Sequence, residues 1–370
     1  MRKILCLSAA ALATACGGSS AQQDAFVRAT PAFDAVALEI TSSDSNSANF
    51  ENETEPDDDA IESAGAGTAD ACHPHLFLRT HEVVSLTNRG LGRVLGPIHR
   101  LLPFGPRYGT DSTKVWERVA NGVDYKYTVT QTTTGTFTAI LQVKPAGAAA
   151  TSFVTVYTAN TTRDPASHDG SGTAMLDLTA LNSVTNQGVG GQLSLNFTVT
   201  SAEKTVIFTM ASFKPRSTAT PRNGHYVFDK QTGKGGSLKF IDDLTLRCTG
   251  APTPAAGSTP VMTVARWIVA SDGTVHFRGD AAATGGQVPN NDKWEGVTCA
   301  LGKAPRETYW MMKLEDSTGA TVPGQSFQST DTTAAACDPA FGLVPLVDSA
   351  ANDYNFSNVN FTSDDPLPFP

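Results

Sequence analysis

Residues 123–130 read VDYKYTVT, and this stretch decides the fold class of the chain. Its apolar residues stand at every second position, with polar residues between them. Because successive side chains of a strand point to opposite faces, the pattern predicts a strand with one dry and one solvated face. Residues 192–199, QLSLNFTV, repeat the pattern. This alternation is typical of antiparallel sheets that cover a core on one side only.

The same period recurs through most of the chain that follows. Further strands are predicted at 136–143, 152–158, 173–178, 205–213, 225–229, 237–246, 261–270, 274–280, 294–300 and 307–314. Asp272-Gly273 gives the strongest hairpin signal, and Asn223-Gly224 marks another break between strands. No repeat of fixed length is visible, which argues against a propeller or a solenoid.

Residues 76–102 follow a helical period instead. Their apolar residues fall on one helix face, at Val84, Leu91, Leu95, Ile98 and Leu102. Pro103 is expected to end this helix, and Pro97 to kink or split it. We expect a core helix packed on the dry face of the sheet. The alternative is a movable lid over an apolar cavity.

Together these patterns predict a mainly β protein of the α+β class. We expect about a dozen strands in a large antiparallel sheet, curled or closed into a half-barrel, because a flat open sheet of that size is unusual. One long N-terminal helix packs on its apolar face. The expected divisions are a signal peptide at 1–15, a lipid anchor and acidic flexible tether at 16–71 with a possible strand at 36–40, a globular domain at 72–348 and a tail at 349–370.

The negative charge of the chain is concentrated near its N-terminus. The whole chain has a net charge of −9, whereas residues 17–70 hold twelve acidic residues and one basic residue, Arg28. Since residues 1–16 add two basic residues and no acidic ones, the chain from residue 71 onward is neutral. A neutral body lacks the basic footprint of a nucleic-acid-binding protein. The acidic segment is too polar to build a core of its own.

The first sixteen residues have the layout of an export signal. Arg2 and Lys3 precede an apolar stretch at 4–12, and small residues then lead to Cys16. The apolar stretch is too short to span a bilayer, which takes about 20 residues. We therefore expect an exported protein.

The residues 13–16, ATAC, resemble the lipobox of bacterial lipoproteins, with Ala13 where that family prefers Leu. The resemblance implies that Cys16 is lipidated and becomes the first residue of the mature protein. Several acyl chains give stable membrane attachment, whereas a single chain does not. Gly17 follows the cysteine where an Asp would imply retention at the inner membrane, so the resemblance implies the outer membrane.

Four cysteines remain in the expected body of the protein: Cys72, Cys248, Cys299 and Cys337. An even number in an exported protein predicts two disulfides, and four cysteines allow three connectivities. We favour Cys299 with Cys337, which leaves Cys72 with Cys248.

No catalytic motif is recognisable. The chain has neither the G-x-S-x-G motif of hydrolases nor a phosphate-binding P-loop. Cys72-His73-Pro74-His75, with His81 nearby, is the one local group of metal-ligand types. A zinc site of the finger type needs a second pair of ligands elsewhere, so we expect a disulfide at the helix entrance and neither a metal nor a cofactor. The stretch and its helix also resemble uncharacterised lipoproteins from bacteria with lipoprotein-rich envelopes, which implies no activity.

Aromatic residues recur on the predicted strands and are most simply explained as core. If the sheet curls around a space larger than its own side chains fill, the same residues line an apolar pocket. The candidates for such a lining are Tyr125, Tyr127, Phe197, Phe208, Trp267 and Trp310.

Three functions remain open, and the third is an enzyme of a type that no motif identifies. The first is an envelope lipoprotein that binds a lipid or another apolar ligand in the curled sheet, an arrangement similar to that of the periplasmic lipoprotein carriers. The second is a structural or surface-interaction lipoprotein of the adhesion type, with an envelope partner and no small-molecule ligand. The expected partners are the membrane, through the anchor, and either an apolar ligand or an envelope protein, but no nucleic acid.

Overall fold

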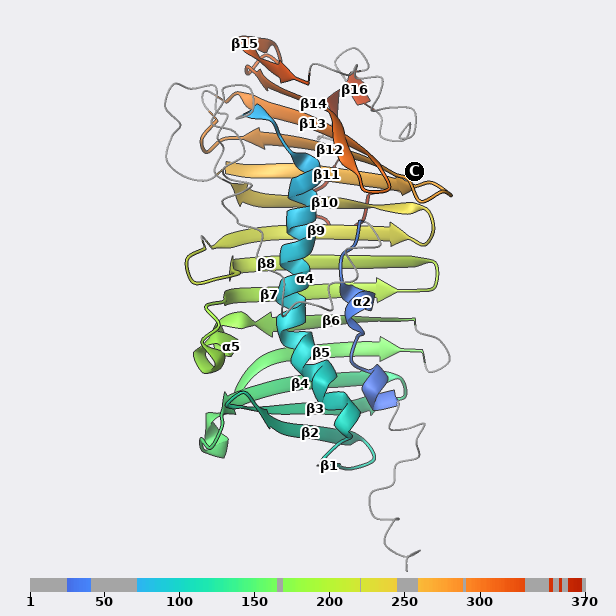
Figure 1. Cartoon of the computed structure of the whole chain (residues 1–370), viewed down its shortest axis with the longest axis vertical. Helices are drawn as coiled ribbons and strands as arrows, with labels where there is room; N and C mark the ends of the chain where they lie inside the picture. Colours follow the sequence, from blue (N-terminus) through green and yellow to red (C-terminus); the bar gives the residue numbers. More distant parts are fainter. Residues whose placement is uncertain are drawn as a thin grey trace, which may run out of the picture.

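The computed structural model describes residues 25–40, 72–164, 169–219, 221–244, 259–288, 291–329, 346–348, 353–354 and 359–367. Fifteen strands form one antiparallel sheet, in which neighbouring strands are also neighbours in the chain. The strands run across the long axis of the molecule (Figure 1). They are β1 (Tyr108–Gly109), β2 (Thr113–Ala120), β3 (Val123–Thr133), β4 (Thr136–Pro145), β5 (Val154–Arg163), β6 (Gly170–Asp177), β7 (Gly190–Val199), β8 (Glu203–Lys214), β9 (Arg222–Gln231), β10 (Gly235–Leu244), β11 (Thr259–Val269), β12 (Val275–Thr284), β13 (Lys293–Gly302), β14 (Arg306–Glu315) and β15 (Thr321–Gln328).

The alternating pattern identified twelve of the fifteen strands of this sheet. Each of the twelve predicted strands lies within or largely overlaps one strand from β3 to β14. In β7, for example, Leu193, Leu195 and Phe197 are buried and the polar residues between them are exposed. The turn at Asp272-Gly273 joins β11 to β12, with Gly273 at φ 83°. Asn223-Gly224 lies inside β9 and is not a break between strands.

The sheet is open and uncurled, so the predicted half-barrel is wrong. The strand order ends at β1 on one side and β15 on the other. An alternating pattern specifies which face of each strand is dry, but closure depends on the stagger and tilt between strands. The dry face is covered by other parts of the chain instead of by the sheet itself.

The long helix α4 (Leu76–Leu101), extended by a 3₁₀ turn at Leu102–Phe104, covers much of the dry face. It lies across the strands and contacts β11 to β13 near its start and β2 and β3 near its end (Figure 1). Its predicted apolar face is buried. The helix lies within the chain and is not N-terminal, and it continues through Pro97, so neither a split nor an N-terminal position is correct.

Residues 25–40 pack beside α4 on the same face of the sheet (Figure 1). They contain a short helix, α2 (Phe33–Val36), and no strand at 36–40. The side chain of Asn88 binds the backbone of Leu38 twice: Oδ1 accepts from its N–H and Nδ2 donates to its carbonyl, both at 2.8 Å. This part of the expected tether is therefore built into the core.

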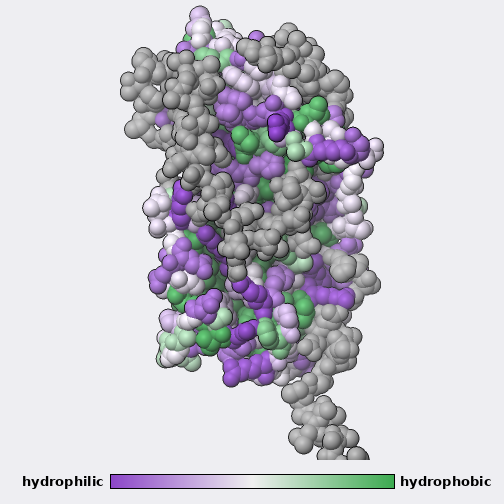
Figure 2. All heavy atoms as spheres, viewed as in Figure 1, coloured by the Kyte–Doolittle hydropathy of each residue, from purple (hydrophilic) through white to green (hydrophobic). Residues whose placement is uncertain are grey.

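The core lies between the sheet on one side and α4 with residues 25–40 on the other. In the space-filling view from the helix side, green hydrophobic residues show only as scattered patches among purple and white ones (Figure 2). Among the described residues, no helix is long and apolar enough to cross a membrane.

The remaining elements lie at the margins of the sheet or on its other face. They are the helix α5 (Leu178–Thr185), a 3₁₀ turn at Ala150–Ser152 and the pair β16 (Leu346–Asp348) and β17 (Asp353–Tyr354). On the face opposite α4, Phe361 and Leu367 of the C-terminal segment pack against Val264 of β11. The same segment accepts a hydrogen bond at the Asn360 carbonyl from Lys239 of β10, at 2.7 Å.

Candidate functional sites

The start of α4 is held against the sheet at two glycines. A Cβ atom on Gly279 of β12 would come within 2.8 Å of Leu76 Cβ, and one on Gly296 of β13 within 3.1 Å of Pro74 Cβ. The Leu76 backbone N–H donates to Thr298 Oγ1 of β13, at 3.3 Å. Because the two glycines have no side chains, the chain before the helix can touch the sheet.

Three aromatic rings stack at this point. His75, the N-cap residue of α4, has a left-handed backbone with φ 43° and ψ 39°, which residues other than glycine rarely adopt. Its ring lies 3.6 Å from that of His73, centroid to centroid. The His73 ring in turn lies 4.4 Å from Trp310 of β14, with an interplanar angle of 17°. The stacking holds both imidazoles over the sheet.

Glu307 reaches the same place because β14 contains a β-bulge. The pairing of β13 with β14 proceeds residue by residue as far as Tyr309, and then skips Thr308 to reach Glu307. In a regular strand, residues three positions apart point to opposite faces. The extra residue therefore puts Glu307 on the same face as Trp310, toward the start of α4.

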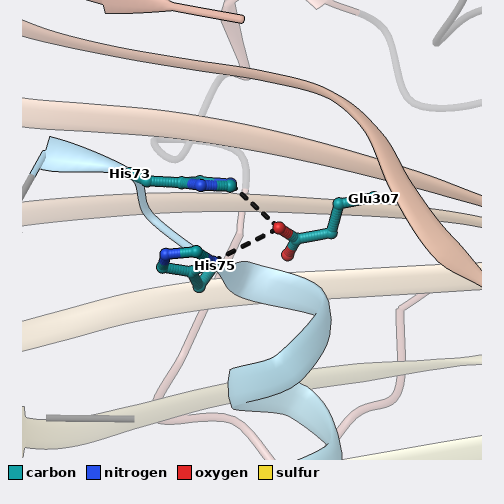
Figure 3. A group of neighbouring side chains, drawn as sticks. All are labelled: His73, His75 and Glu307. Atoms are coloured by element: carbon teal, nitrogen blue, oxygen red, sulfur yellow. Dashed lines mark ion pairs between the residues drawn. The ribbon is translucent and has the colours of Figure 1, made fainter. Parts of the chain in front are cut away.

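The polar atoms of His73, His75 and Glu307 converge (Figure 3). Glu307 Oε2 lies 2.9 Å from His73 Nε2 and 3.4 Å from His75 Nδ1. All three atoms His73 Nε2, His75 Nδ1 and Glu307 Oε1 are buried. The two nitrogens face Glu307 Oε2, whereas Glu307 Oε1 has no hydrogen-bond partner within the described part of the chain. Burial alone raises the pKa of the Glu307 carboxyl, but the two imidazoles beside it outweigh burial and lower the pKa to about 2.

This arrangement has the ligand types of a metal site. One ligand atom from each of the three residues lies within 4.8 Å of the other two. Imidazole nitrogens and a carboxylate are ligands of Zn²⁺ and related ions. The sequence pointed to the two histidines but not to Glu307, which is distant in the chain and lies next to a bulge that no pattern marks. His81 lies apart from this group, with its ring edge-on to Phe77 at 4.5 Å.

Two of the predicted disulfide residues can be placed. Cys72 and Cys299 are both disulfide-bonded, and no bridge joins two cysteines of the described segments. Cys72 packs with Leu76 on the helix side, whereas Cys299 packs with Tyr309 on the opposite face. Cys248 and Cys337 lie outside the described residues, as does Cys16. The pairings Cys72 with Cys248 and Cys299 with Cys337 stay predictions.

The six candidates for a cavity lining are part of packed structure. Four of them are buried to 1% exposure or less in the core between sheet and helix: Tyr127, Phe197, Phe208 and Trp267. Tyr125 is partly buried against that core. Trp310 instead stacks on His73. A ligand role for these residues stays a prediction that requires displacement of α4.

The face of β3 to β8 that points away from α4 is solvated and uncharged at its centre. Two rows of paired side chains run across these six strands, and every member is exposed or half-buried. The rows are Thr130, Thr138, Asn160, Thr173, Asn196 and Ile207, and Thr128, Ile140, Thr158, Met175, Ser194 and Thr209. None of the twelve is charged or aromatic, and nine carry a hydroxyl or an amide.

The chain matches no protein-family profile, no curated protein and no solved structure.

Proposed function

We propose that this protein is an exported envelope lipoprotein, anchored through Cys16 in the outer membrane, that binds a neutral hydroxyl-rich polymer of the envelope. The binding surface is the solvated face of β3 to β8. The observation that carries the proposal is the chemistry of that face: two rows of side chains across six strands, with no charge and no aromatic ring.

Hydroxyl and amide groups both donate and accept hydrogen bonds, so they match the hydroxyls of a neutral polysaccharide. Strand spacing places these groups about 4.8 Å apart along a row, and the two-residue repeat places the rows about 6.8 Å apart. Nucleic acid requires basic side chains, which this surface lacks. Protein partners are held mainly by aromatic and arginine anchors, which it lacks as well.

The docking of residues 25–40 supports a body held close to the membrane. If Cys16 carries the lipid, only residues 17–24 separate the anchor from the first described residue, Ala25. A fully extended chain of that length reaches roughly 30 Å. The acidic residues 41–71 then connect two parts of the body and are not the link to the membrane.

The alternative function, an apolar ligand held against the dry face, receives less support. The sheet is open, and the dry face is occupied by α4 and by residues 25–40. Native mass spectrometry of protein taken from its own envelope tests this alternative, because a co-purifying lipid at a fixed stoichiometry would favour it.

The polymer proposal is tested by co-sedimentation of the purified chain with insoluble neutral polysaccharide isolated from the envelope. Thr173 and Asn196 are paired across β6 and β7 at the centre of the face, so the double variant Thr173→Lys/Asn196→Lys puts two like charges there. We expect its retention to fall at least tenfold. Gln187→Lys, at an exposed position after α5, is the matched control and should bind like the unaltered chain. Equal retention of all three proteins, or none for any, overturns the proposal.

The anchor is tested separately by the mass of the mature N-terminus. We expect diacylglyceryl-modified Cys16 as the first residue, and release of a Cys16→Ser variant from the membrane fraction. An unmodified Cys16 or a different first residue refutes the anchoring.

A further inference from the structure

We propose that His73, His75 and Glu307 bind one divalent first-row transition-metal ion at the junction of α4 with β13 and β14. This inference does not depend on the polymer-binding face or on the lipid anchor. It rests on the position of three ligand atoms.

The spacing of those atoms suits a metal ion. In a tetrahedral site with bonds of about 2.0–2.1 Å, the ligand atoms lie roughly 3.3 Å from one another. The two measured separations from Glu307 Oε2, 2.9 Å to His73 Nε2 and 3.4 Å to His75 Nδ1, bracket that value. Three protein ligands leave a fourth position for water or for a ligand from a partner.

The hydrogen bonding of the group is incomplete without an ion. A buried polar atom that makes no hydrogen bond is costly, and such atoms are uncommon in folded proteins. Here Glu307 Oε1 lacks a hydrogen bond to any described residue, and two buried ring nitrogens, His73 Nε2 and His75 Nδ1, face one and the same carboxylate oxygen, Oε2. A cation coordinated by the two nitrogens and the carboxylate would satisfy the group together.

The three side chains are also held in place by their surroundings. Trp310 stacks on the His73 ring, and the left-handed backbone of His75 fixes the direction of the second ring. The bulge at Thr308 directs Glu307 toward both. Ligands that are positioned in advance lose less conformational freedom when the ion binds.

The competing explanation is an ion pair between protonated histidine and Glu307 that only fastens the start of α4 to the sheet. The two explanations differ in their response to metal. A metal site takes up one ion, whereas an ion pair takes up none.

The test is a titration of chelator-treated protein with Zn²⁺ in the presence of a chromophoric competitor. We expect one equivalent to bind to the unaltered chain, and at least tenfold weaker binding for Glu307→Gln and for His73→Gln. His276→Gln is the matched control, because His276 lies on β12 beside Ile268 and outside this group. Circular dichroism and urea unfolding check that each variant is folded.

A second measurement covers variants that do not fold. Electron paramagnetic resonance of the unaltered chain loaded with one equivalent of Cu²⁺ should show two coordinated imidazole nitrogens. Zinc uptake that is absent, or that is equal in His73→Gln and His276→Gln, overturns the proposal. Copper bound without imidazole nitrogens overturns it as well.

Discussion

The replacement Asn88→Ala tests whether residues 25–40 are an integral part of the fold. The Asn88 side chain is 2% exposed and makes two hydrogen bonds of 2.8 Å to the backbone of Leu38. Each net hydrogen bond contributes about 1 kcal/mol, and a buried group left without its partner costs about 1–3 kcal/mol. Removal of the amide leaves one N–H and one carbonyl without partners. We therefore expect the free energy of unfolding to fall by about 2–4 kcal/mol.

Urea unfolding followed by tryptophan fluorescence measures this change. Limited proteolysis should also cut the Asn88→Ala chain within residues 25–40 before the sheet is cut. Asn160→Ala, on the solvated face of β5, removes the same amide at an exposed position and should change stability by less than about 0.5 kcal/mol. If Asn88→Ala is no more destabilising than Asn160→Ala, residues 25–40 are not held by this contact and the reasoning fails.

Three further predictions concern the helix and the buried charges. Gly90→Ala should destabilise the chain by about 1–3 kcal/mol, because its Cβ would lie 2.5 Å from Leu193 Cδ1 of β7. Gly96→Ala, whose Cβ would have no described side chain nearer than Arg100 at 3.7 Å, should stabilise the chain by about 0.5–1 kcal/mol. Thermal melts that shift both variants in one direction would contradict this. Arg79→Leu should lower the free energy of unfolding in urea by about 3–5 kcal/mol, because it leaves the buried carboxylate of Asp242 without its ion-pair partner. A decrease below about 1 kcal/mol would show that the pair is dispensable. Burial, together with the neighbouring Glu203, raises the pKa of Asp229 from 3.8 to about 6, so the folded state holds this proton more tightly than the unfolded state does. The stability of the unaltered chain relative to Asp229→Asn should therefore fall by up to about 3 kcal/mol as the pH rises from about 4 to about 6. A stability difference that does not depend on pH refutes this prediction.

The sequence predicted individual strands well because each strand is specified locally. Where one face of a strand is buried against the core and the other is solvated, apolar and polar residues alternate along its sequence. β2 was missed because Val115 and Trp116 are adjacent and both buried, which breaks the alternation. β15 was missed because Pro323 and Gly324 interrupt it and none of its residues is buried.

The arrangement of those strands and the site at the start of α4 could not be predicted in the same way. Whether a sheet curls depends on stagger and twist between strands, which no single strand encodes. Residues 36–40 alternate like a strand, but they lie beside α4 on the face of the sheet, where Ala37 is buried as well as Leu38. Glu307 meets His73 through a bulge and a contact between distant parts of the chain.

The two ends of the sheet bear on whether the protein can polymerise. A large open sheet has two outer strands whose unpaired backbone groups invite a second copy to add to it. At one end β1 is only two residues long, Tyr108–Gly109, so it has few unpaired backbone groups with which a strand of a second copy could pair. At the other end Pro323 removes one N–H donor from β15, and Gly324 has φ 76°, which is not a strand conformation. Both outer strands therefore offer few backbone groups to a second copy of the chain, which works against polymerisation by strand pairing.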